Sequence, residues 1–147
     1  MALRENLGLT MWEKVGIVRS ARALQQGLME IETIREELVS IGLPDGDRAF
    51  NLTWHDWLNL DNLLTVSGVI AAAALARENS RGAHYREDFT DTGDLKTSAY
   101  TRLKLDRYKI VKSLEPVEFS IVAPGESLID DAAGAPAAAS ATRQSPV

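Results

Sequence analysis

Residues 51–88, NLTWHDWLNLDNLLTVSGVIAAAALARENSRGAHYRED, decide the fold of this chain. Its polar start and long apolar continuation predict a helix that Thr53 caps, with Asp56 as the acid of a capping box. Apolar residues recur along it at helical spacing in two rows, Trp57, Leu60, Leu64, Ala71 and Leu75 in one and Leu63, Val66, Ile70 and Ala74 in the other. A helix with two apolar faces is expected to be buried between neighbours. It should end near Asn79, because Gly82 can adopt the left-handed conformation that helix ends often need.

Two further helices are predicted before this stretch. Between Ile17 and Ile41 the apolar residues follow a heptad-like pattern, which predicts a helix over about residues 20–40 that packs lengthwise against others. The turn at residues 42–47 is short, so this helix and the next should be antiparallel neighbours. Residues 2–18 predict a short amphipathic helix with a bend near Gly16, in which Trp12 is a core or interface anchor.

The character of the sequence changes after residue 88. Residues 100–111 alternate or are rich in strand formers, which predicts a small hairpin or extended arm. From residue 130 the sequence is of low complexity, and we expect a disordered tail. The predicted fold class is therefore all-α. It is an antiparallel three-helix bundle, like a spectrin repeat, with a short N-terminal helix, a small extended or β arm and a disordered C-terminal tail. The predicted domains are a helical bundle at 1–90, the arm at 91–129 and the tail at 130–147.

The charged turn after the long helix resembles a known family. Residues 77, 80–84 and 86–89, with Leu-Asp-Asn at 60–62, resemble the C-terminal helical domain of the flavoprotein subunits of succinate dehydrogenase and fumarate reductase, and of L-aspartate oxidase. The resemblance covers residues 2–90. Two positions depart from the usual pattern, because Asn79 stands where Glu is common and Thr90 where Pro is common.

In that family the flavin and the dicarboxylate are held by other domains, so the resemblance implies no catalytic or cofactor-binding residue in this chain. FAD would lie in the implied partner domain. The resemblance implies instead that the helical domain packs against the flavin domain, with the charged turn in the contact. The interface candidates are Arg77, Ser80, Arg81, His84, Arg86, Asp88 and Trp12. Arginine suits such a contact because its planar fork makes several directed hydrogen bonds at once.

Composition and the absence of known motifs argue against several other functions. The two histidines form no helical pair and there is no cysteine, so no metal site is predicted. No glycine-rich phosphate cradle or serine nucleophile motif is present. A net charge of −5 argues against nucleic-acid binding. No apolar run approaches the length of a membrane span, and the first residues lack the apolar core of a signal peptide, so the expected location is cytoplasmic, or at the inner membrane face through a partner complex.

Two features of the charge pattern leave alternatives open. Asp61 and Asn62 lie midway along the apolar helix and are interpreted first as polar struts, with Asp61 paired to an arginine of another helix or of the charged turn. Residues 81–112 carry eight basic and five acidic residues, whereas the segments on either side are each acidic by four charges. This positive segment either folds back on acidic helix faces or forms an edge for a partner domain or an anionic ligand.

Two functions remain possible at this stage. The first is an accessory C-terminal domain or small subunit of an FAD-dependent fumarate reductase or succinate dehydrogenase, which is not catalytic by itself. The second is a helical adaptor that is not associated with an enzyme. The first predicts that the partner is a flavin-binding domain or subunit, and that the chain self-associates as a homodimer when that partner is absent.

Overall fold

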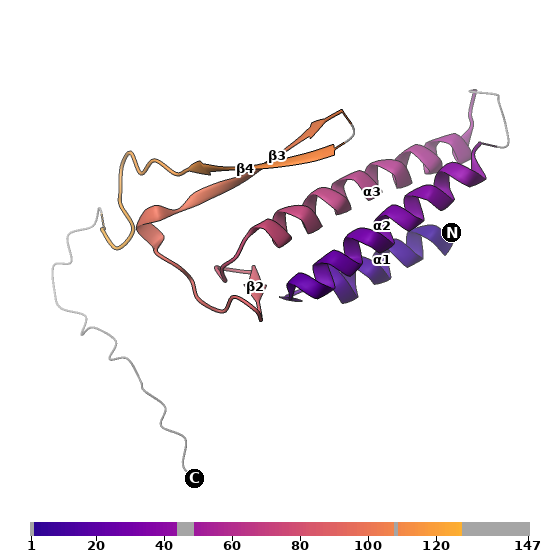
Figure 1. Cartoon of the computed structure of the whole chain (residues 1–147). Coiled ribbons are helices and arrows are strands. Elements are labelled where there is room, and N and C mark those ends of the chain that lie inside the picture. The colour runs from indigo at the N-terminus through magenta and orange to yellow at the C-terminus, as the bar shows by residue number, and fades with distance from the viewer. Residues whose placement is uncertain (1, 44–48, 108, 128–147) are drawn as a thin grey trace, which may run out of the picture. The chain divides into compact units, whose positions relative to one another are not determined.

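The computed structural model describes residues 2–43, 49–107 and 109–127, and its largest elements are three helices that run side by side (Figure 1). They are α1 (Ala2–Val15), α2 (Ala21–Ile41) and α3 (Leu52–Ala76). Short elements follow or separate them, namely β1 (Val18–Arg19), β2 (Tyr85–Arg86), the 3-10 helix η1 (Leu95–Thr97), β3 (Ala99–Asp106) and β4 (Lys109–Pro116). The mostly helical class with a small strand arm is as predicted. The prediction of three main helices with a short helix before them is not matched in full. Among the described residues the long helices are α2 and α3, and the shorter α1 is the third helix.

The core lies between the three helices. Its members are apolar residues from one face of each helix, Leu7, Val15, Leu24, Ile31, Ile34, Leu38, Leu60, Leu64, Ala71 and Ala74. Leu24 and Leu64 are completely buried. Burial of a leucine side chain stabilises the fold by about 1.5–3 kcal/mol, so the core accounts for the association of the helices. The predicted seam of α2 is only partly correct, because Ile17 precedes the helix and Ile41 is exposed.

Polar contacts show that neighbouring helices run in opposite directions. Near the end of α2, the carbonyl of Leu38 accepts a hydrogen bond from the indole of Trp57, which lies near the start of α3. Arg35 of α2 forms an ion pair with Asp61 of α3, with 2.8 Å between Nη1 and Oδ1. Thr10 of α1 donates a 2.7 Å hydrogen bond to Glu30 of α2. The predicted partner type for Asp61, an arginine of another helix, is therefore present.

The helix ends follow local capping chemistry. Asn51, and not Thr53 as predicted, caps α3, because its side-chain oxygen accepts a 2.9 Å hydrogen bond from the amide of Trp54. Thr53 lies inside the first turn. Helix α3 ends at Ala76, three residues before the predicted end. Helix α1 ends just before Gly16, as predicted, and a β-carbon at Gly16 would collide with the carbonyl oxygen of Trp12.

The second apolar row of α3 is exposed, which corrects the prediction that both rows are buried. Leu63, Val66 and Ile70 are 45%, 56% and 44% exposed, and only Ala74 of that row is in the core. We call Leu63, Val66 and Ile70 the exposed row. Trp12 on α1 is also not a core residue, since it is 76% exposed. Helices α1 and α2 cover one side of α3, and this row faces away from the core that they form.

By length and composition alone, α3 could cross a membrane, whereas no such run was expected from the sequence. The criterion is weak evidence for a single helix, because the central helix of a packed core also meets it. In this structure one face of α3 carries core residues, and Asp61 on the helix is paired with Arg35 of α2.

The strands form two small sheets. β1 and β2 pair in parallel, Val18 opposite Tyr85 and Arg19 opposite Arg86, a contact that the sequence did not predict. β3 and β4 form the predicted antiparallel hairpin, and both strands contact α3. Within the described residues, those up to Val117 belong to one compact unit and those from Glu118 to a second. The predicted domain boundaries stay predictions. The predicted tail at 130–147 lies outside the described residues.

Candidate functional site

Arg86 is the centre of the charged turn, which we define as residues 77–89. Its side chain is 1% exposed, and its Nε and Nη2 atoms donate to the two carboxylate oxygens of Asp88 at 2.6 and 2.7 Å. The aromatic ring of Phe89 lies 4.9 Å from the guanidinium carbon. A bidentate ion pair together with a cation–π contact fixes the guanidinium in one orientation.

This ion pair joins the ends of two helices. The Nη1 atom of Arg86 donates to the carbonyl oxygens of Ala74, Leu75 and Arg77, at 3.1, 3.2 and 3.2 Å, where α3 ends. Asp88 in turn accepts a 2.8 Å hydrogen bond from the amide of Ala21, the first residue of α2. A positive charge thus lies at a helix C-terminus and a negative charge at a helix N-terminus, which is the favourable orientation for both helix dipoles.

Ser80 holds the backbone of the turn in place. Its hydroxyl accepts from the amide of Arg86 at 2.9 Å and donates to the carbonyl of Phe89 at 2.7 Å. Its own amide donates to the carbonyl of Asp91 at 2.8 Å. Gly82 has a φ of 56°, in the left-handed region that an L side chain rarely adopts. The turn is therefore specified by several residues that each satisfy a backbone requirement.

Arg19 was not predicted from the sequence, but it connects the turn to α1. Its Nε donates to the carbonyl of Gly16 at 2.7 Å and to that of Val15 at 3.2 Å, which satisfies the end of α1. Its Nη1 lies 2.8 Å from Nδ1 of His84. The available signal was its position three residues after a helix-breaking glycine, where basic side chains commonly satisfy the last helical carbonyls.

His84 is held in its neutral form. Because the arginine can only donate, Nδ1 of His84 accepts, and Nε2 carries the proton that is shared with the carbonyl of Arg77 at 3.3 Å. Burial lowers the pKa of His84, and the nearby charges of Arg19 and Arg77 lower it further, although the Arg77 carbonyl opposes them. The hydrogen bond from Arg86 holds the pKa of Asp88 well below its usual range.

Arg81 organises the loop that follows the turn. Its guanidinium donates to the carbonyls of Thr92 and Asp94 and to the hydroxyl of Ser98. Arg86, Arg19 and Arg81 therefore each satisfy backbone carbonyls of a different segment. Together they hold the end of α1, the end of α3 and the approach to β3.

The predicted interface residues divide into two groups. Ser80, His84 and Arg86 are buried within this chain, and Asp88 is paired with Arg86. The described hydrogen bonds of Arg86 go to atoms of the chain itself, so these four residues make internal contacts. Arg77 and Arg81 remain partly exposed, and Trp12 is well exposed on α1. Asp61 is partly exposed and paired as a strut, whereas Asn62 is exposed. A role in a contact with another domain stays a prediction for the exposed and partly exposed residues Arg77, Arg81 and Trp12.

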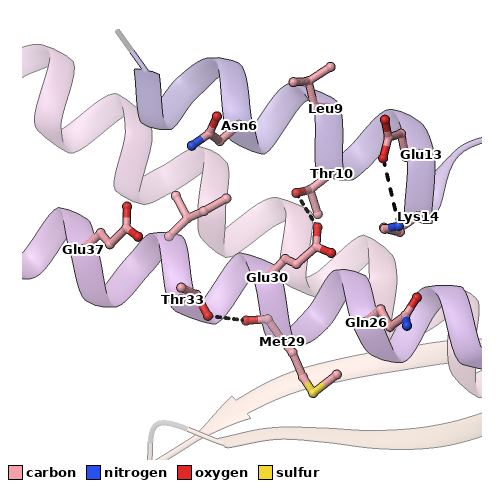
Figure 2. A pocket seen from close by; sticks show the side chains of 11 residues that line it. Asn6, Leu9, Thr10, Glu13, Lys14, Gln26, Met29, Glu30, Thr33 and Glu37 are labelled. Carbon is pink, nitrogen blue, oxygen red and sulfur yellow. Dashed lines mark hydrogen bonds and ion pairs between the residues drawn. The ribbon is translucent and has the colours of Figure 1, made fainter.

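A groove of about 570 Å³ lies between α1 and α2. Figure 2 shows the hydrogen bond between Thr10 and Glu30 across it, and the ion pair of Lys14 with Glu13. The Lys14 Nζ atom lies 4.0 Å from a carboxylate oxygen of Glu13. Thr33 likewise donates to the carbonyl of Met29. Some of its polar groups thus already have a partner within the chain. Within the part of the chain that the structure describes, no three potential ligands gather as a metal site would require.

Comparison with known proteins shows the family to which this chain belongs. Residues 4–128 match the family described as the fumarate reductase flavoprotein C-terminus. The chain belongs to this family. The succinate dehydrogenase flavoprotein subunit from Coxiella burnetii is 37% identical over 103 residues, 68% of this chain and 18% of the relative. A fumarate reductase (CoM/CoB) protein from Methanothermobacter marburgensis is 39% identical over 90 residues, which are 61% of this chain and 16% of the relative.

The solved structures agree with the family assignment. Quinol fumarate reductase FrdA from E. coli, in a single-substitution variant, superposes with a TM-score of 0.77 at 26% identity, over 85% of this chain and 22% of that one. The chain therefore corresponds to the C-terminal domain of much longer flavoprotein subunits, and it spans about a fifth of their length. The resemblance stated from the residues of the charged turn is confirmed.

Proposed function

We propose that this chain is the accessory helical domain of an FAD-dependent fumarate reductase or succinate dehydrogenase, and that it packs against the flavin-binding part of that enzyme. FAD and the reacting dicarboxylate are held by that partner, either in the same polypeptide or in a separate one. The chain contributes no catalytic residue of its own. Location at the cytoplasmic face of the inner membrane, through the complex that the partner forms, remains part of this proposal.

The exposed row of α3 carries the proposal. Leu63, Val66 and Ile70 lie on one face of α3 and are exposed. Contact of such apolar side chains with water is unfavourable, so a partner that covers them would stabilise the domain. The relatives that share this domain are about four times longer than this chain, so they contain further chain that could cover this surface. The same surface would favour self-association when the partner is absent.

The proposal is tested by mixing the purified chain with the cognate flavin-binding part expressed without its own C-terminal domain. We expect a one-to-one complex on gel filtration that carries flavin absorbance. The double variant Leu63→Glu/Val66→Glu should lose the complex, because two carboxylates would be desolvated in the contact. The matched control is Met29→Glu/Val39→Glu, which puts the same charges at exposed apolar positions of α2.

Two results would refute the proposal. One is the absence of any complex with the wild-type chain at concentrations of about 10 μM, well above the dissociation constant of a stable domain contact. The other is equal loss of binding in both double variants while their melting temperatures are unchanged. Persistent homodimers with no affinity for the flavin-binding part would favour the adaptor function instead.

A further inference from the structure

A charged pocket of about 400 Å³ lies between β1, α3, the charged turn and β3. Its polar lining consists of Arg19, Arg77, His84, Tyr100 and Thr101. The rest of its wall is apolar and includes Ile70, which is also the last member of the exposed row. The pocket and the apolar surface proposed for docking are thus continuous.

The two arginines of this pocket lack a counter-ion. Among residues 2–43, 49–107 and 109–127, no carboxylate lies within 4 Å of the charged nitrogens of Arg19 or Arg77, whereas Arg35 has two and Arg86 has one. The described hydrogen bonds of Arg77 use only its Nε, which donates to the side chain of Asn79 at 2.9 Å. Its two terminal nitrogens, which form the fork suited to a carboxylate, have no partner among those residues.

His84 separates the arginines without adding a charge. It accepts from Arg19 and donates to the carbonyl of Arg77, so it bridges the two residues in its neutral form. The pocket therefore carries two positive charges that are partly removed from water. A guanidinium in this situation is stabilised when an anion supplies both opposite charge and hydrogen-bond acceptors.

We infer that the charged pocket receives a carboxylate side chain, aspartate or glutamate, of the flavin-binding part. This inference rests on the proposed function. The occupant is assigned to a protein side chain because Ile70 belongs to both surfaces, so a partner seated on the exposed row reaches the pocket. A free anion would meet arginines that are still partly exposed and screened by salt, whereas a docked partner removes that water.

The pocket changes the assignment of the interface arginines. The sequence made Arg77, Arg81 and Arg86 interface candidates, but Arg86 is already paired with Asp88 and Arg81 with loop carbonyls. Arg77 is the member of that set with an unused fork, and Arg19 joins it from another part of the chain. The contact is therefore specified by residues 58 positions apart that β1 and the charged turn bring together.

The inference is tested with Arg77→Gln in the binding assay of the proposed function. We expect the dissociation constant to rise about tenfold or more, with an unchanged melting temperature, because a desolvated ion pair is lost. The binding of the variant should also depend less on salt. The matched control is Arg22→Gln, which removes an arginine that is exposed on α2, and it should bind within about twofold of wild type.

The outcomes separate the two hypotheses. If wild type binds and Arg77→Gln binds equally well, the inference is wrong and the proposed function stands. If wild type does not bind at all, both fail. A third arm titrates acetate and succinate into the isolated chain and follows the arginine side-chain nitrogens by NMR. Saturable binding tighter than about 1 mM that requires Arg77 would identify a small-molecule site and overturn the assignment to a side chain.

Discussion

The two apolar rows of α3 are alike in sequence and different in environment. Leu64 lies in the core at 0% exposure, while Leu63, the adjacent residue, is 45% exposed. Both rows have helical spacing and similar residues, so periodicity alone predicts that both are covered. The difference shows that a hydrophobic pattern specifies which face needs a neighbour, and not whether this chain supplies that neighbour.

The largest expected effect comes from truncating one residue of each row. Leu64→Ala should lower the free energy of unfolding by about 2–5 kcal/mol, because it opens a cavity in a packed core. Leu63→Ala should change it by less than about 0.5 kcal/mol. Denaturant unfolding of the two variants measures both values. Equal effects would mean that the two rows are buried alike in solution, and a denaturation midpoint that hardly moves in Leu64→Ala would count against the helical core.

The same comparison shows how far sequence alone could lead. The position of α2 and α3 followed from apolar spacing, which reports burial directly. The capping residue of α3 did not, because Asn51 and Thr53 are both good caps and only the path of the preceding chain selects one. The charged turn was recognisable from its residues, but the roles within it depend on Arg19, whose contact with His84 spans 65 positions. No local pattern contains that information.

A second difference separates the paired Arg86 from the unpaired Arg77. Arg86→Met should lower the free energy of unfolding by about 2–3 kcal/mol, since the end of α3 loses its donor and Asp88 loses its partner. Arg77→Gln should have little effect on the same measurement, because its fork makes no described contact within the chain. Thermal and urea unfolding of both variants decide the point. A larger loss in Arg77→Gln would make it the structural residue of the two.

A third contrast is between the partly exposed ion pair Arg35–Asp61 and the ion pair of the buried Arg86. The side chains of Arg35 and Asp61 are 27% and 36% exposed, so water screens their interaction. A double-mutant cycle with Arg35→Gln and Asp61→Asn should give a coupling energy of about 0.2–1 kcal/mol. The value should shrink in 1 M salt. A coupling above about 2 kcal/mol would show that Asp61 is a buried strut, as the sequence pattern first indicated.

The last contrast concerns pH and the two ionisable residues of the charged turn with lowered pKa. His84 has a pKa below its ordinary value of 6.5 in the folded state, so between the two values the unfolded chain binds more protons than the folded one. The contribution of His84 is therefore complete above pH 6.5 and is lost as the pH falls through its folded pKa. Asp88 acts in the same direction, but only below its ordinary value of 3.8.

The melting temperature should consequently fall as the pH is lowered, with a contribution of His84 that begins below pH 6.5 and one of Asp88 that begins below pH 3.8. His84→Gln isolates the first, because glutamine can still accept from Arg19 and donate to the carbonyl of Arg77 but cannot be protonated. We expect the variant to lose the part of the wild-type decline below pH 6.5 that belongs to His84 and to keep the part that belongs to Asp88 below pH 3.8. His55, which is exposed on α3, provides the control through His55→Gln, and this variant should retain the full decline. If both variants decline as wild type does, His84 is free to take up its proton in the folded state. The pair of hydrogen bonds that holds Arg19 and Arg77 on either side of it would then not be maintained in solution.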